Sequence, residues 1–96
     1  MMKEKTLPMD AIDRLCREVA AKRLLFLAET PAGEPPEIVV DWPQAIPSDA
    51  ANRFFQLAEG LESIFGQPVT LIELHAVANP ARKAEIAERG QEVWHA

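Results

Sequence analysis

Apolar residues follow a helical spacing in some segments of the chain and form short continuous runs in others, and these patterns predict its helices and strands. From Met9 to Val19 the apolar residues recur every three or four positions, which predicts an amphipathic helix. The segment 24–29 opens with a continuous apolar run, which is typical of a strand buried on both faces. A second run, over 37–41 and rich in Ile and Val, predicts another strand. The prolines and glycine of 31–36 predict a tight connection, so the two strands should form a hairpin.

The second half of the chain predicts a long helix followed by one more strand. The apolar stripe over 54–65 has helical spacing, Ser48 is a good N-cap before it, and Gly66 ends it. Phe55 lies off this stripe, which makes it a candidate contact with a partner. The run over 69–74 is apolar on both faces and predicts a third strand.

The chain then predicts a short closing helix and a tail. Asn79 is an N-cap followed by a proline at the first helical position, and the helix should end before Gly90. The tail contains Val93 and Trp94. A Trp next to a Val is favoured to pack onto the body of a protein, so we expect this tail to be tied down.

These elements predict an α/β (α+β) fold with a small mixed three-stranded sheet packed with helices. The order is helix, strand, strand, helix, strand, helix. A chain of 96 residues supports one hydrophobic core, so we expect a single domain over 1–96. The strand–helix–strand connection should be right-handed.

Composition narrows the possible functions. Ten Lys and Arg against fifteen Asp and Glu give a net charge of −5, which opposes a broad hold on nucleic acid phosphates. The adjacent pairs 22–23 and 82–83 are the visible basic positions, and both are expected to be solvated positions near helix ends. No apolar run approaches the ~20 residues of a membrane-spanning helix. We therefore expect a cytoplasmic protein with no direct contact to membranes or nucleic acids.

The few nucleophilic and metal-binding residue types do not form a motif. Cys16 is the only cysteine and falls on the apolar face of the first helix, where a buried, inert thiol is expected. His75 and His95 are the only histidines and stand far apart in the sequence. Surface or core positions are more common for such residues than a shared metal.

The hairpin from Leu24 to Trp42, with the elements that follow it through Trp94, resembles the minimal nucleotidyltransferase family of the DNA polymerase β-like superfamily. In that family a strand ends in a Gly-Ser turn, the next strand opens with Asp-x-Asp, and a third Asp starts the strand after the long helix. The closing segment NPARKAEIAERGQEVW looks like the family's final helix, glycine and aromatic tail. The resemblance implies a nucleotidyltransferase-like fold.

Nucleotidyl transfer in such proteins needs Mg²⁺ held by clustered carboxylates, and a permissive turn whose backbone amides approach the phosphates. Laid on this sequence, the Gly-Ser turn falls on Ala28 and Glu29. A carboxylate at Glu29 would repel a triphosphate. Gly33 is what survives of the turn, and its expected role is a local backbone conformation that other residues avoid.

The metal-ligand positions are also altered. The Asp-x-Asp pair falls on Pro35 and Glu37, and the third Asp falls on Thr70. Only Glu37 keeps a carboxylate, which makes it a weak candidate for a metal ligand. The resemblance therefore implies a degenerate member that lacks most catalytic residues. We expect no cofactor and no ordinary two-metal catalysis.

Two functions remain open. Minimal nucleotidyltransferases often pair with an all-helical HEPN-type protein, so the resemblance implies an interaction or antitoxin-type subunit whose partner is such a protein or a second copy of this chain. The alternative is a residual nucleotidyltransferase or nucleotide-binding protein with an atypical Mg²⁺ site built from Glu37 and either Glu29 or Asp41. Self-association through an exposed edge of the three-stranded sheet is a third possibility.

Overall fold

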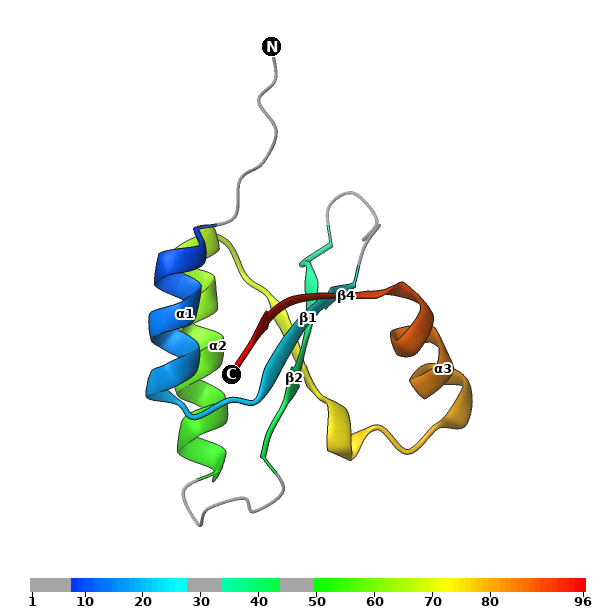
Figure 1. The fold of residues 1–96 in the computed structure, drawn as a ribbon. Helices are drawn as coiled ribbons and strands as arrows, with labels where there is room; N and C mark the ends of the chain where they lie inside the picture. The colour runs from blue at the N-terminus through cyan, green and yellow to red at the C-terminus, as the bar shows by residue number, and fades with distance from the viewer. Residues whose placement is uncertain (1–7, 28–33, 44–49) are drawn as a thin grey trace.

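A computed structural model describes residues 8–27, 34–43 and 50–96. Figure 1 shows a small sheet with two helices side by side on one face and a third helix on the other. The predicted mixed α+β architecture is therefore confirmed. No helix in the described ranges is long and apolar enough to cross a membrane.

Within the described residues the sheet has four strands, where the sequence predicted three. The strands are β1 (Arg23–Leu27), β2 (Glu37–Asp41), β3 (Thr70–Glu73) and β4 (Gly90–His95), in the spatial order β3-β2-β1-β4. The hairpin of β1 and β2 is antiparallel, and β3 lies parallel to β2 on its other side. Both pairings agree with the predicted hairpin and crossover.

Strand β4 is the tail that was predicted only to pack onto the body. It runs antiparallel to β1, with Leu24 opposite Trp94 and Leu25 opposite Glu92, so Val93 is an extra residue at a β-bulge. Three of its six residues are Gln, Glu and His, and it has no β-branched run, which is why the apolar pattern did not predict it. β4 covers the edge of β1 that a three-stranded sheet would leave open.

Three α-helices and one short 3₁₀ helix complete the described elements: α1 (Met9–Glu18), α2 (Ala50–Phe65), η1 (Leu74–Ala76) and α3 (Pro80–Arg89). Asn79 caps α3 as predicted, because its side-chain oxygen accepts hydrogen bonds from two backbone N–H groups of the first turn. Gly66 has φ +71° at the end of α2, the left-handed conformation expected of a glycine cap. Ser48, the predicted cap of α2, lies outside the described residues.

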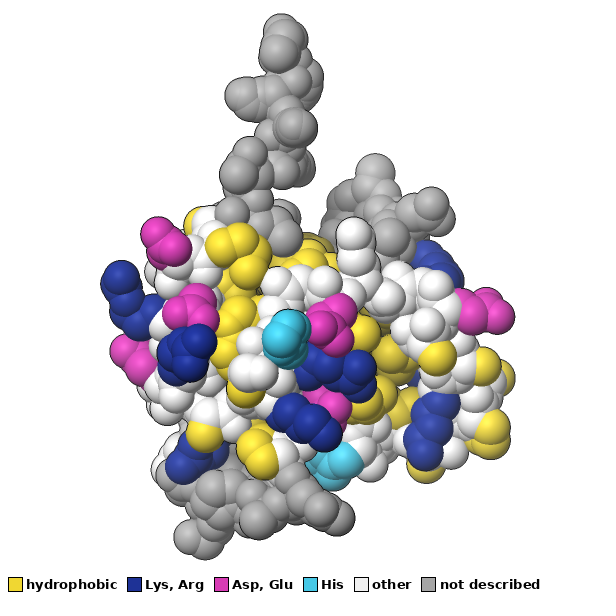
Figure 2. Space-filling model, viewed as in Figure 1, with side chains coloured by type: hydrophobic (Ala, Val, Ile, Leu, Met, Phe, Trp, Pro, Cys, Tyr) yellow, Lys and Arg dark blue, Asp and Glu magenta, His cyan; other side chains and the backbone are white. Residues whose placement is uncertain are grey.

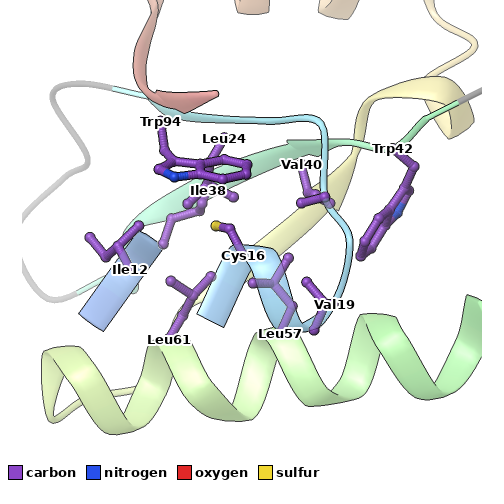
Figure 3. Close-up of a cluster of buried hydrophobic side chains, with 11 residues drawn as sticks. Ile12, Cys16, Val19, Leu24, Ile38, Val40, Trp42, Leu57, Leu61 and Trp94 are labelled. Atoms are coloured by element: carbon purple, nitrogen blue, oxygen red, sulfur yellow. The ribbon is translucent and has the colours of Figure 1, made fainter. Parts of the chain in front are cut away.

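The first face of the sheet carries the main hydrophobic core. Alternate residues of the hairpin, including Leu24, Ile38 and Val40, are fully buried against Leu57 and Leu61 of α2. Figure 3 shows this cluster, with Cys16 of α1 near its centre and Trp42 and Trp94 at its two ends.

Polar bonds tie both tryptophans of this core to neighbouring elements. The Trp94 indole donates a hydrogen bond of 2.9 Å to Asp13, and the Trp42 indole donates one of 2.9 Å to Glu73. The prediction that the aromatic tail is tied onto the body is confirmed, because Trp94 is buried.

The second face of the sheet is smaller and partly ionic. Its buried centre consists of Leu25, Leu27, Val39 and Ile86, the last from α3. Successive residues of a strand point to opposite faces, so Glu37 and Asp41 share this face with Val39. The second face therefore has an apolar middle with a carboxylate at each end of β2.

Candidate functional site

The starts of β2 and β3 bring two of the predicted site positions together. Glu37 is opposite Thr70 in the parallel pairing, and the backbone N–H of Thr70 donates a 2.9 Å hydrogen bond to the carbonyl oxygen of Pro36. Pro35 lies exposed two residues before Glu37. This end of the sheet is where the resemblance places the metal ligands.

The Glu37 carboxylate pairs with a cation from α3. The guanidinium of Arg82 lies 3.3 Å from Glu37 Oε1 through one nitrogen and 2.8 Å from Glu85 Oε1 through another. Arg89, one turn further along α3, lies 2.9 Å from the second oxygen of Glu85. The Asn79 cap fixes where α3 begins, so it helps to place Arg82 over the start of β2.

These contacts favour the charged forms of the groups on α3. Hydrogen bonding from Arg82 is the main cause that lowers the pKa of Glu85 below its usual value, and the charges of Arg82 and Arg89 add to the effect. The same bond to Glu85, with a further contribution from Glu37, raises the pKa of Arg82. A permanent positive charge therefore sits between two carboxylates.

We call Glu37, Arg82 and Glu85 the Glu37 cluster. The remaining predicted site positions do not belong to it. Ala28, Glu29 and Gly33 lie outside the described residues. Asp41 lies at the far end of β2, four residues from Glu37, which at ~3.3 Å per residue separates their Cα atoms by about 13 Å. There Arg23 lies 3.2 Å from Asp41 and 3.6 Å from Glu92, so Asp41 belongs to a separate ion-pair cluster.

The side chains at the Glu37 end do not fit a Mg²⁺ site. Mg²⁺ demands near-octahedral oxygen ligands, normally from one or two free carboxylates plus waters and substrate phosphates. Here Glu37 is the one carboxylate of the three aligned positions, Thr70 and Pro35 carry no charge, and Arg82 already neutralises Glu37. The described part of the chain contains no group of three His, Cys, Asp or Glu side chains placed to hold a metal.

Other nucleophilic and basic groups lie elsewhere. Cys16 is buried in the main core, and burial raises the pKa of its thiol to about 12, with the Asp13 charge as a smaller cause. Such a thiol stays protonated and inert, which agrees with the prediction. Figure 2 shows Lys and Arg side chains interspersed with Asp and Glu on the visible face, where no broad basic patch forms.

Sequence reasoning missed the role of Arg82. The prediction placed the pairs 22–23 and 82–83 at solvated positions near helix ends. For Arg23 this is wrong, because it lies half-buried within β1. For Arg82 the available signal was the i, i+3 spacing to Glu85, which favours a pair on one helix face. The contact with Glu37 joins residues 45 positions apart in the chain and needed the fold.

Comparison with known proteins shows the fold. No family model matches the sequence, and the curated proteins contain no significant match. Solved structures of toxin–antitoxin complexes are similar. One chain, from a mutant MntA–HepT complex, has a TM-score of 0.69 and 18% identity, covering 94% of this chain and 75% of that one. A chain from a toxin–antitoxin structure with AMP-PNP has a TM-score of 0.67, with 18% identity and the same coverage.

A third similar chain comes from the complex of a tri-AMPylated Shewanella oneidensis HEPN toxin with an MNT antitoxin. Its TM-score is 0.62 at 17% identity, covering 91% of this chain and 69% of that chain. Identities this low show the fold alone. The chain therefore has a nucleotidyltransferase-like fold of the kind found in the MntA proteins of these complexes.

Proposed function

We propose that this protein is an antitoxin-type subunit that acts by binding an all-helical HEPN-type partner and does not transfer nucleotides. The observation that carries the proposal is the Glu37–Arg82 ion pair beside Thr70, at the end of the sheet where the fold family's carboxylates would be expected. The architecture that positions a nucleotidyltransferase site is kept, while its charge arrangement is different.

The Arg82 guanidinium is the main physical obstacle to a metal at this position. A divalent cation approaching Glu37 would have to displace Arg82 from both Glu37 and Glu85, and of the three aligned positions only Glu37 would offer it a carboxylate. Repulsion between the metal and a guanidinium so close to Glu37 opposes binding further. We therefore propose that the protein needs no Mg²⁺ for its function.

The fold comparisons support the choice of partner. The similar chains come from toxin–antitoxin complexes, and one of those complexes pairs a HEPN toxin with an MNT antitoxin. The fold match covers 94% of this chain, so its helices and strands lie in the same arrangement as in those chains. The net charge of −5 suits a partner with a basic surface.

The test is co-expression with the product of a neighbouring gene that encodes an all-helical protein. We expect the two proteins to elute together at the mass of a complex, and expression of this chain to relieve any growth arrest that the helical protein causes. Glu37→Gln should relieve the arrest as well as the wild type does. The mass of the helical protein should not increase when ATP and Mg²⁺ are present.

The alternative function, a residual nucleotidyltransferase, makes the opposite prediction in the same experiment. If relief requires Glu37, and if ATP adds a nucleotide to the helical protein, the protein is an enzyme with an atypical site. The separation of Asp41 from Glu37 disfavours the version of this site that uses both residues. If the chain forms no complex with the helical protein, the antitoxin-type role is wrong.

A further inference from the structure

The outward face of α2 has one large aromatic side chain that the fold does not use. Phe55 is 62% exposed, in contrast to Leu57 and Leu61 of the same helix, which are fully buried. Its ring makes an edge contact with Phe54, with centroids 5.7 Å apart. That contact limits the motion of the Phe55 ring, and an ordered aromatic side chain loses little entropy when it is buried by a partner.

The charged residues of α2 that lie in line with Phe55 are acidic. Residues at i+4 and i+7 lie on the same helix face, so Glu59 and Glu62 line up with Phe55, and both are exposed. One oxygen of the Glu62 carboxylate accepts a 3.3 Å hydrogen bond from the backbone N–H of Val69. The only basic residue of α2 is Arg53, and its guanidinium points away from this stripe to donate a 2.8 Å hydrogen bond to the carbonyl oxygen of Val19. We call the stripe of Phe55, Glu59 and Glu62 the Phe55 face.

We infer that the Phe55 face is the surface on which the helical partner docks. The partner's surface would be an apolar pocket that receives the Phe55 ring, rimmed by Lys or Arg side chains that meet Glu59 and Glu62. This inference rests on the proposed antitoxin-type function and names the surface that performs it. The acidic side chains around an exposed aromatic residue favour a basic partner, and buried aromatic anchors with a polar rim are typical of interface hot spots.

This surface lies away from the Glu37 cluster. α2 packs on the first face of the sheet, whereas Glu37 and Arg82 lie on the second face with α3, as Figure 1 shows for the helices. Partner binding through the Phe55 face would therefore not depend on the state of the nucleotidyltransferase-like end of the sheet.

The experiment measures the affinity of the full chain for the co-expressed helical protein by calorimetry, with wild type and Phe55→Ala compared. Loss of a hot-spot aromatic should weaken binding about 30-fold or more. Met9→Ala is the matched control, because Met9 is also an exposed apolar residue, 39% exposed, but lies on α1. Its affinity should stay within about twofold of the wild type.

A charge variant gives a second readout. Glu59→Lys should weaken binding and reduce its dependence on salt, because opposite charges at an interface rim mainly govern salt dependence and association rate. The control is Glu88→Lys, which makes the same charge change at an exposed residue of α3. It should have little effect on the affinity. Circular dichroism spectra equal to that of the wild type would show that all four variants are folded.

The outcomes separate the two proposals. A wild-type complex that Phe55→Ala and Glu59→Lys leave unchanged would overturn the docking surface and leave the antitoxin-type function standing. If the wild-type chain binds no helical protein, both proposals are overturned. If Phe55→Ala instead abolishes a dimer of this chain alone, the occupant of the face is a second copy and the inference is wrong.

Discussion

The two faces of the sheet differ in how they are held together. On the first face, α1 and α2 bury a continuous apolar layer that includes Leu24, Ile38 and Leu61. On the second face, α3 covers a small apolar centre around Val39 and Ile86, and an ion pair lies at each end of β2. Burial of apolar surface dominates folding free energy, whereas exposed ion pairs contribute little.

The first face therefore supplies most of the folding stability, whereas the candidate site lies on the second face. The first face has few polar groups and a well-packed core, so its residues are constrained by volume. The second face holds Glu37 and Thr70, which the sequence resemblance aligns with metal ligands, and its ionic contacts are expected to change with small effects on folding. The nucleotidyltransferase-like fold is present with Arg82 paired to Glu37 on this face.

The largest expected effect comes from truncating a core residue on the first face. Leu61→Ala should lower the free energy of unfolding by about 3–5 kcal/mol, because Leu61 is fully buried and a cavity would remain. Ile86→Ala on the second face should lower the free energy of unfolding by about 2 kcal/mol, the low end for such a change, because Ile86 packs in a smaller hydrophobic cluster. Urea unfolding measures both. Equal losses would show that the two faces are packed alike.

Alanine substitutions at two glycines, one on each side of the sheet, should also differ in their effect on stability. A Cβ at Gly90 would lie 2.5 Å from the backbone oxygen of Ile86, so Gly90→Ala should cost about 1–3 kcal/mol as the junction of α3 and β4 shifts. A Cβ at Gly60 would lie 2.6 and 2.7 Å from the two terminal carbons of Leu15 and 3.2 Å from its Cγ, so this flexible side chain must shift to admit it. The helix propensity of Ala, ~1 kcal/mol better than Gly, should offset that adjustment. Thermal unfolding that showed a larger loss for Gly60→Ala would contradict this reading.

The ion pair of the second face should contribute much less. A double-mutant cycle with Glu37→Gln and Arg82→Met should give a coupling of about 0.2–1 kcal/mol, because both side chains are partly exposed to water. The coupling should decrease as salt is added. A coupling that is several times larger and insensitive to salt would show that this end of the sheet is a structural centre of the fold.

The smallest effects concern pH. The pKa of Asp13 is lowered chiefly by the hydrogen bond from Trp94, and that of Glu85 chiefly by the bond from Arg82. A carboxyl whose folded pKa is lowered stabilises the fold above its unfolded pKa, and this stability is lost as pH falls through the folded pKa. Unfolding midpoints should therefore fall in acid, below about pH 4. Asp13→Asn should make that acid dependence shallower, and an unchanged slope would contradict the assignment.

Much of the fold follows from local patterns. The spacing of apolar residues predicted α1, α2 and the hairpin, and the Asn79 cap and Gly66 gave helix ends that the structure confirms. β4 was not predicted, because an edge strand with polar outward residues has neither a period-two apolar pattern nor a β-branched run. The sheet consequently has one more strand than the sequence indicated.

The candidate site was only partly predictable. The resemblance aligned Glu37 and Thr70 with two metal-ligand positions of the minimal nucleotidyltransferases. The parallel register of β2 and β3 places these two residues opposite each other. The contact of Glu37 with Arg82 depends on how α3 folds back over the sheet, which no local pattern contains. Long-range ion pairs leave no periodic signal in a single sequence, so the group that neutralises Glu37 could be found only in the structure.

We propose that Arg82 neutralises the Glu37 end of the sheet and that this end holds no divalent metal. Calorimetric titration of the full chain with Mn²⁺ and ATP tests this directly, with Glu37→Gln as the matched variant. We expect no saturable micromolar binding for the wild type and the same heats for the variant. Saturable binding that Glu37→Gln abolishes would show that Arg82 does not block the site and would identify a working metal–nucleotide site.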